Sequence, residues 1–441
     1  MKCINCGTDN NLKDRTANQG RCKQCNHPFA FEPTTMGSLK VTDPMFAKAL
    51  ADISANETLY FTPKQFLYFL DNRLRKKGFQ LMSFIPIYLI MNIWATLFFG
   101  GFFSFIPNSF FIANLIYQAG VILYLFNNTK SNKLNNMGRK ASTIALRFVG
   151  ILILVVGILV SLLIQSFPIF AAVVVVGMSS IYLGIRQLGK IGNLAQEFLI
   201  PQANLDSWLE TWQRINGTLN QLLPSPQNQI APASINPDVT AYSFDRLVVC
   251  DNSKVAQLLI ANNFHFENNC AILSANGYPE NIFETTMGML RRNPNLQVFA
   301  FHDCTPKGVT LAHRLSTSED WFFNHSVRII DLGLLPRQII ASKKAMFIQK
   351  SDYSSQKSQE LPSEVREKLT SEELAWLDSG NTVELESLSP RMLIKVLQNG
   401  ISRSMSLIED DSSLFVSNDY ALSAIDDHDS IHNVYIVENF G

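Results

Sequence analysis

Two long stretches of the chain contain no charged side chain. Residues 79–126 form the first and residues 148–185 the second, and apolar positions dominate both. Each stretch is too long for one buried helix and long enough for two membrane crossings joined by a tight turn. Turn residues stand near the middle of each, at Gly100-Gly101 and Pro107 in the first and at Pro168 in the second. The pattern therefore predicts four membrane-spanning helices.

The predicted spans are 17 to 21 residues long: 81–99, 110–126, 144–164 and 169–185. The alternative is a large helical hairpin buried in a water-soluble protein. Helices of soluble proteins keep a polar face, and these stretches have none, so we favour the membrane. A channel or transporter is a weaker possibility, because the uncharged stretches offer no charged group to relay an ion.

Lysine and arginine lie on one side of the predicted spans. They precede the first span, fill the loop between the second and third, and follow the fourth: Arg73, Arg75, Lys76, Lys77, Lys130, Lys133, Arg139, Lys140, Arg186 and Lys190. The turns at 100–108 and 165–168 hold none. Cytoplasmic loops carry an excess of cations. We therefore expect a multi-pass protein of a bacterial inner membrane, with both termini in the cytoplasm and no cleavable signal before the polar N-terminal motif.

Further helices are expected on either side of the spans. Thr42-Asp43-Pro44 and Thr62-Pro63 are typical helix starts. We expect the apolar face of the second helix, which includes Phe66, Leu67, Phe69 and Leu70, to pack on the membrane surface.

After the last span, residues 194–223 predict an amphipathic helix that contains Trp208 and Trp212. The helix lies at the lipid headgroups or packs on a neighbouring domain, and the sequence leaves both open. Residues 224–237 contain four prolines among polar residues, which indicates a linker.

Four of the seven cysteines form two Cys-x-x-Cys pairs, Cys3 with Cys6 and Cys22 with Cys25, separated by 15 residues. Two such pairs complete a tetrahedral four-sulfur shell for one ion, with no open position for catalysis. The pattern resembles the small zinc ribbons at the N-terminus of many bacterial membrane proteins. A redox dithiol, the alternative, needs only one pair. The residues after each pair, Gly7 and Asn26, are expected at positive φ. In the cytoplasm all seven thiols would stay reduced.

From residue 242 onward, short apolar runs alternate with helical segments. The expected strands cover 247–250, 270–273, 296–301 and 327–330, and the expected helices cover 253–263, 279–292 and 307–315. This order predicts a parallel sheet covered by helices, with functional groups just beyond the carboxyl ends of the strands.

Those strand ends carry polar residues in a recognisable order. Asp251 follows the first strand, Ser274 to Pro279 with Gly277 follow the second, and Asp303-Cys304-Thr305-Pro306-Lys307-Gly308 follow the third. With the later segments 330–339 and 384–388, the order resembles the Toprim domain of the A subunits of type VI DNA topoisomerases, over residues 240–400. The resemblance implies a Mg²⁺ site held by Asp251 and Asp303, the two candidate catalytic residues.

The chain departs from that family at two points. Thr305 stands where the family has a second aspartate, so the set of carboxylates that would bind Mg²⁺ has one negative charge fewer. The membrane anchor occupies the place of the domain that carries the family's strand-cleaving tyrosine. Asp251 and Asp303 could instead be helix-capping or loop acids.

Other polar residues have a functional and a structural interpretation. We expect His302 to be a strand-end side chain rather than a general base, and Cys304 to be inert because no base partner is visible. Arg291-Arg292 indicate a solvated helix end rather than a phosphate clamp. The acidic groups at 409–411 and 426–429 are typical of a solvated tail, with weak Ca²⁺ or Mg²⁺ binding as the alternative.

Charge is divided unevenly between the two halves of the chain. Residues 1–240 hold 20 lysines and arginines against 11 acids, and residues 241–441 hold 17 against 26. The basic half suits an anionic membrane leaflet. The acidic half disfavours nucleic acid as a partner, because phosphates repel it.

We therefore expect a multi-domain protein with a small zinc ribbon, a four-helix transmembrane region and a C-terminal α/β Toprim-like domain with a parallel sheet. The expected boundaries are 1–30 for the ribbon, 31–78 for a helical bridge, 79–190 for the spans, 191–240 for the amphipathic helix and linker, 241–400 for the α/β domain and 401–441 for the acidic tail. Structural zinc is the expected cofactor, with Mg²⁺ as a second candidate.

The preferred function is a binding or scaffold module that uses membrane lipid as its anchor and recognises a cytoplasmic protein or a nucleotide-bearing partner, with homo-oligomers possible. The alternative is a membrane-tethered Mg²⁺-dependent nuclease or phosphotransfer enzyme, acting in defence against foreign nucleic acid.

Overall fold

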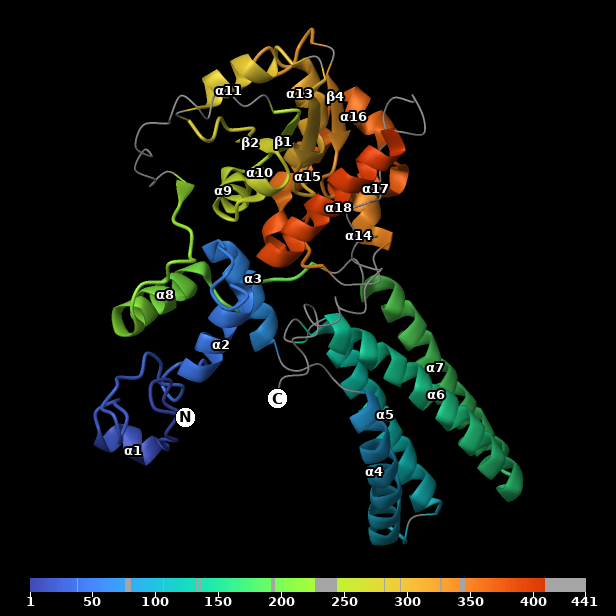
Figure 1. Ribbon diagram of the computed structural model, residues 1–441. Helices are drawn as coiled ribbons and strands as arrows, with labels where there is room; N and C mark the ends of the chain where they lie inside the picture. Colours follow the sequence, from blue (N-terminus) through green and yellow to red (C-terminus); the bar gives the residue numbers. More distant parts are fainter. Residues whose placement is uncertain are drawn as a thin grey trace. The chain divides into compact units, whose positions relative to one another are not determined.

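A computed structural model shows the elements of the chain (Figure 1). It describes residues 1–37, 39–75, 81–105, 107–131, 134, 136–191, 195–226, 244–280, 282–293, 295–325, 327–341 and 346–408. Of the residues singled out above, Lys76, Lys77, Lys133, most of the proline-rich linker and both acidic groups after residue 408 lie outside this part. The chain forms two compact units, one of residues 75–197 and the other of residues 1–74 with most of the chain from Phe198 onward.

Four helices of the first unit are long and apolar enough to cross a membrane, which confirms the prediction of four apolar spans. They are α4 (Leu81–Phe102), α5 (Ser109–Lys130), α6 (Asn136–Ile164) and α7 (Phe167–Ile191). Helix α4 continues through Gly100-Gly101 rather than breaking there. Gly100 instead lets the Phe110 ring approach the helix backbone, and the Ser109 hydroxyl donates to the Gly100 carbonyl at 2.8 Å.

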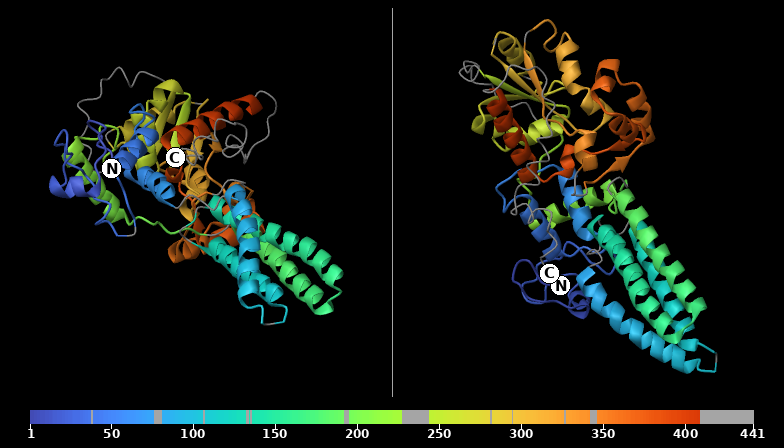
Figure 2. Two further views of the ribbon diagram at one scale, coloured as in Figure 1. Left: turned by 90° about the horizontal axis from the view of Figure 1, so that it is seen from below. Right: turned by 90° about the vertical axis from the view of Figure 1, so that its right-hand side faces the viewer.

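Helices α6 and α7 run side by side in every view (Figures 1 and 2). Their contact is built from glycines spaced seven residues apart, Gly150 and Gly157 on α6 and Gly177 and Gly184 on α7, with no room for a side chain at any of the four. Small residues at such spacing allow helix backbones to approach closely in lipid. The Ser180 hydroxyl adds a hydrogen bond of 2.7 Å to the Leu146 carbonyl.

The second unit contains a small helical core. Helices α2 (Asp43–Ile53), α3 (Pro63–Leu74) and α8 (Gln202–Asn216) bury their apolar faces against one another. The predicted helix starts at 43 and 63 are confirmed. The carboxylate of Asp71 on α3 accepts the backbone N–H groups of Leu199 and Ile200, which ties the segment before α8 to α3.

The apolar faces of α3 and α8 are covered by protein. Phe66 and Leu70 of α3, expected on the membrane surface, are fully buried in the helical core. Trp212 of α8 is buried against Phe31 and Phe46, with ring centroids 6.0 and 5.0 Å away. Helical spacing alone predicts an apolar face but cannot specify whether lipid or protein covers it, and here protein does.

The C-terminal region holds the predicted four-stranded parallel sheet, in the order β2-β1-β3-β4. The strands are β1 (Arg246–Cys250), β2 (Cys270–Ser274), β3 (Gln297–Phe301) and β4 (Arg328–Asp331). The connecting helices are α9 (Ser253–Ala261), α10 (Phe264–Glu267), α11 (Phe283–Leu290), α12 (Pro306–Val309) and α13 (Leu311–Thr317). All carboxyl ends therefore lie at one edge of the sheet.

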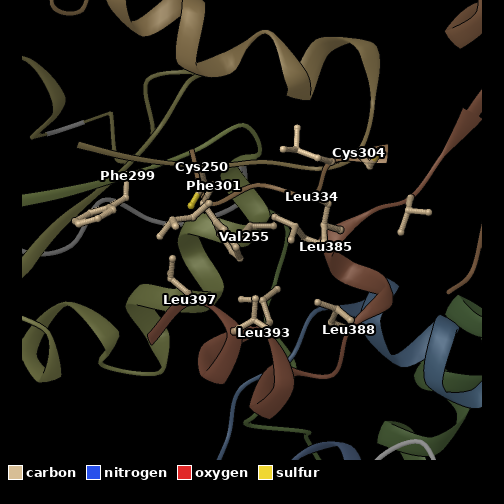
Figure 3. Packing of buried hydrophobic residues seen from close by; sticks show 14 of the residues in the cluster. Cys250, Val255, Phe299, Phe301, Cys304, Leu334, Leu385, Leu388, Leu393 and Leu397 are labelled. Carbon is tan, nitrogen blue, oxygen red and sulfur yellow. The ribbon is translucent and has the colours of Figure 1, made fainter. Parts of the chain in front are cut away.

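Alternate residues of each strand face opposite layers. Leu247 and Val249 of β1 pack with α11 and α13, whereas Val248 and Cys250 face the layer that contains α9 and α18. Figure 3 shows this second layer, where Leu393 and Leu397 of α18 approach Val255 of α9.

The elements after β4 complete that layer. They are α14 (Pro336–Ala341), α15 (Asp352–Gln359), α16 (Ser363–Lys368), α17 (Ser371–Asp378) and α18 (Pro390–Ile408), with the antiparallel pair β5 (Gln349–Lys350) and β6 (Asn381–Thr382) and the 3-10 turn η3 (Leu385–Ser387). Ile401 of α18 is buried in this core.

Candidate metal centre and acidic strand edge

The four cysteines of the N-terminal pairs converge on one point. Their sulfur atoms all lie within 4.8 Å of one another, and the Cys3–Cys25 and Cys6–Cys22 distances are each 3.6 Å. A disulfide would require about 2.05 Å. A tetrahedral ion with Zn–S bonds of about 2.3 Å places its sulfurs slightly less than 4 Å apart. The group can therefore hold a metal such as zinc.

The two halves of this centre have the same backbone. The Cys3 N–H donates to the Thr8 carbonyl and the Cys22 N–H to the His27 carbonyl. Gly7 and Asn26 have φ of 73° and 57°, which confirms the expected positive values. Between the pairs lies the short helix α1 (Leu12–Ala17), with Asn11 as its N-cap.

The four sulfurs differ in their surroundings, and burial raises the pKa of Cys3 to about 11. Backbone N–H groups, chiefly that of Cys25, lower the pKa of Cys22 to about 6, so this thiolate forms at neutral pH. The Asn10 side chain also donates to its sulfur, at 3.5 Å. All four ligand positions are thiols, so an ion held by all four would have no open coordination position.

Asp251 and Asp303, the predicted Mg²⁺ ligands, follow β1 and β3 at the carboxyl edge of the sheet. The two strands are neighbours, and the backbone N–H of Asp303 donates to Oδ2 of Asp251 at 2.9 Å. Oδ1 of Asp303 accepts the N–H of Leu385 at 2.6 Å. Oδ1 of Asp251 is buried without a partner in the described part of the chain. The structure therefore brings the two predicted acids together.

Both carboxyls are perturbed in the same direction. Burial, and then the charge of Asp251, raises the pKa of Asp303 well above its ordinary value. Burial also raises the pKa of Asp251. Two buried carboxyls at close range do not both ionise unless a cation joins them. Burial therefore favours the neutral form of both carboxyls more than in exposed acids.

Two further acids, Glu384 and Glu386, belong to the same edge. Their charges also raise the pKa of Asp303. The pattern 384–388 is visible in the sequence, but the role of these side chains is not, because segments far apart in the chain create their environment.

Helix α3 brings a cation to these acids. The Lys64 ammonium lies 2.7 Å from Oε1 and 2.6 Å from Oε2 of Glu384, and the Tyr68 hydroxyl donates to Oε2 at 2.8 Å. The Thr62 hydroxyl donates to Oε1 of Glu386 at 2.7 Å. Burial alone would lower the pKa of Lys64, but the charge of Glu384 outweighs burial and raises it. We call these contacts the α3 clamp.

The other singled-out residues have structural roles. The Thr305 hydroxyl accepts the Gly308 N–H at 2.9 Å and so caps α12. Cys304 is fully buried, and burial raises its pKa far above the range of a reactive thiol. Arg291 donates to the carbonyls of Glu319, Asp320 and Trp321.

His302 is fully buried between two acceptors. Its Nδ1 lies 2.8 Å from the Asp303 carbonyl, and its Nε2 lies 3.0 Å from Oδ1 of Asp331. Each contact requires a proton on the ring nitrogen, so both nitrogens are protonated. Burial alone would lower the pKa of His302, but Asp331 outweighs it and the pKa reaches about 9. The ring also packs against Gly333, where no side chain would fit.

The His302–Asp331 pair predicts a loss of stability in alkali. Because the pKa of His302 is about 9 in the folded chain and about 6.5 in the unfolded chain, its contribution is complete below pH 6.5 and disappears as the pH rises through 9. The expected contribution is on the order of 3 kcal/mol. Thermal unfolding of the detergent-solubilised chain between pH 6 and 10 measures it. His302→Gln is the control, and an equal alkaline loss in that variant would contradict the assignment.

Comparison with known proteins identifies no relative: no protein-family model, curated protein or solved structure matches the chain. The class of protein is therefore defined by the structure alone. It combines four apolar helices of membrane-spanning length with a four-cysteine group that can hold a metal and a domain with a four-stranded parallel sheet.

Proposed function

We propose that this chain is a membrane-anchored binding or scaffold protein, with a zinc ribbon and a degenerate Toprim-like domain on the cytoplasmic side of a bacterial inner membrane. The excess of lysine and arginine around the spans supports the orientation, as does the absence of these residues from the two opposite turns. The domain would recognise a cytoplasmic protein or a nucleotide-bearing partner at the membrane.

The α3 clamp is the observation that carries this proposal. Both carboxylate oxygens of Glu384 contact the Lys64 ammonium, so a lysine already neutralises one of the acids at the strand edge. The carboxylates of Asp303 and Asp251 each accept a hydrogen bond from a backbone N–H. Among the described residues, only the cysteines form a group of three or more with metal-ligand spacing. These contacts support a surface that is paired within the protein, with Oδ1 of Asp251 as the exception.

A second candidate is a membrane-tethered Mg²⁺-dependent nuclease or phosphotransfer enzyme. The buried, unpartnered Oδ1 of Asp251 favours it, because an unpaired carboxylate oxygen in the protein interior is costly without a cation. If Mg²⁺ binds, Asp251 and Asp303 are the residues that would hold it, and the ion would stabilise charge on a phosphoester.

Assays of the full chain in detergent distinguish the two functions. We expect no cleavage of single-stranded or double-stranded DNA, RNA or an aryl phosphate with Mg²⁺ or Mn²⁺ above the level of Asp303→Asn. Asp352→Asn, at an exposed position of α15, is the matched control. Metal-dependent turnover that Asp303→Asn abolishes and Asp352→Asn retains would overturn the scaffold proposal and establish the enzyme.

A further inference from the structure

Hydrogen-bonding side chains line one face of α4 inside the apolar spans. Tyr88, Asn92 and Thr96 are spaced four residues apart, so they form a stripe about 12 Å long on one side of the helix. Asn114 and Gln118 of α5, also four residues apart, face this stripe.

The hydrogen bonds of this stripe connect the two helices. The Tyr88 hydroxyl donates to Oε1 of Gln118 at 2.7 Å. Nδ2 of Asn114 donates to Oδ1 of Asn92 and to the Thr96 hydroxyl, each at 2.8 Å. The α6–α7 pair, by contrast, is packed through glycines. The two hairpins are thus held together by different interactions.

The asparagine pair has hydrogen-bonding capacity left over. An Asn side chain has two N–H donors and one carbonyl acceptor. Both donors of Asn114 are used, but its Oδ1 has no partner among the described residues. Within the part of the chain that the structure describes, Nδ2 of Asn92 donates to the Tyr88 hydroxyl alone, at a long 3.4 Å, which leaves one of its N–H groups without a partner there. Asn92, Thr96 and Asn114 are half-buried, so each residue keeps part of its surface exposed.

Lipid cannot satisfy these groups. The hydrocarbon interior of a bilayer has no donors or acceptors, so unpaired amides there strongly favour protein partners. The unused groups are one acceptor, Oδ1 of Asn114, and one donor, Nδ2 of Asn92. The two lie at the same depth because they belong to side chains that bond each other.

Membrane insertion gives every copy of the chain the same orientation, so a twofold axis along the membrane normal brings identical depths together. Across such an axis, the donor of each Asn92 meets the acceptor of the other copy's Asn114, and the contact occurs twice. We propose that the asparagine stripe of α4 and α5 is the contact surface of a symmetric homodimer within the membrane. This inference is independent of the function of the α/β domain.

Energy transfer between donor-labelled and acceptor-labelled full-length chains in liposomes, diluted with lipid, measures the association. We expect Asn114→Leu and Asn92→Leu each to weaken dimerisation about tenfold. The double variant should be little weaker than either single one, because the two side chains form the same intermolecular bonds. Asn127→Leu, at an exposed position nearer the end of α5, is the matched control and should not change association.

A photo-crosslinker provides a second measurement that keeps the asparagines. Phe99 lies on the stripe side of α4 and Ile90 about opposite, at 100° per residue, and both are exposed within one copy. Benzoylphenylalanine at 99 should yield a cross-linked dimer, and at 90 it should not. Wild-type chains that remain monomeric at the highest protein-to-lipid ratio, or association unchanged by Asn114→Leu, would overturn the proposal.

Discussion

Cys22→Ser is expected to release the metal and unfold residues 1–30, while the four membrane helices stay folded. The cysteines form the centre of this segment: Cys3 and Cys22 are its most buried cysteines, and both contribute sulfurs to the cluster. Structural zinc contributes about 10–16 kcal/mol to the folding of comparable peptides. The folding free energy lost with one thiolate is therefore larger than the short helix α1 could offset. Elemental analysis and hydrogen exchange of residues 1–30 measure the two effects.

Cys270→Ser is the matched control for this experiment. Cys270 is buried in the core of the α/β domain, away from the cluster, so its replacement should leave one metal per chain. Chelation of the wild-type metal should reproduce the exchange pattern of Cys22→Ser. A Cys22→Ser chain that retains a full equivalent of metal, or an unchanged exchange pattern, would show that the sulfurs do not bind one ion together.

Lys64→Met is expected to loosen helix α3 from the strand edge. The change keeps most of the aliphatic side chain but leaves the partly buried Glu384 carboxylate without its cation. Breaking a fully buried ion pair costs about 3–5 kcal/mol. Because both side chains of this pair are partly exposed, about 2 kcal/mol is expected. Faster hydrogen exchange at Phe66 to Leu70 would report the loss.

Two controls isolate the α3 clamp. Lys357→Met removes a lysine from the exposed pair with Glu360, where a cost below about 0.5 kcal/mol is expected. The double variant Lys64→Met/Glu384→Gln should recover part of the stability, because it removes both members of the pair. If Lys64→Met had no more effect than Lys357→Met, the contact would be too weak to hold α3 in place.

Local patterns were sufficient to predict much of the fold. Charge-free stretches predict the four apolar helices because lipid imposes a simple requirement of length and polarity. Cys-x-x-Cys spacing predicts the cluster because four thiols satisfy one ion. The strands 247–250 and 296–301 are apolar runs buried on both faces, and the parallel sheet follows from their alternation with helices.

The environment of the acidic edge could not be predicted in the same way. Asp251 and Asp303 are recognisable because Asp251 directly follows β1 and Asp303 lies two residues after the end of β3. Lys64 is not, because 320 positions separate it from Glu384 and nothing local marks it as a partner. The contact between Asn92 and Asn114 could not be predicted either, because it depends on which faces of the two apolar helices touch.

The helical core has a consequence for synthesis of the protein. Its first helices, α2 and α3, are made before the membrane helices, and its third, α8, is made after them. Until the ribosome has passed residue 212, the surface of Phe31 and Phe46 that Trp212 later covers has no partner. Synthesis of all four apolar helices therefore precedes closure of this core. A chain whose insertion stalls would expose the apolar rings of Phe31 and Phe46. Quality-control proteases and chaperones act on such exposed apolar surface.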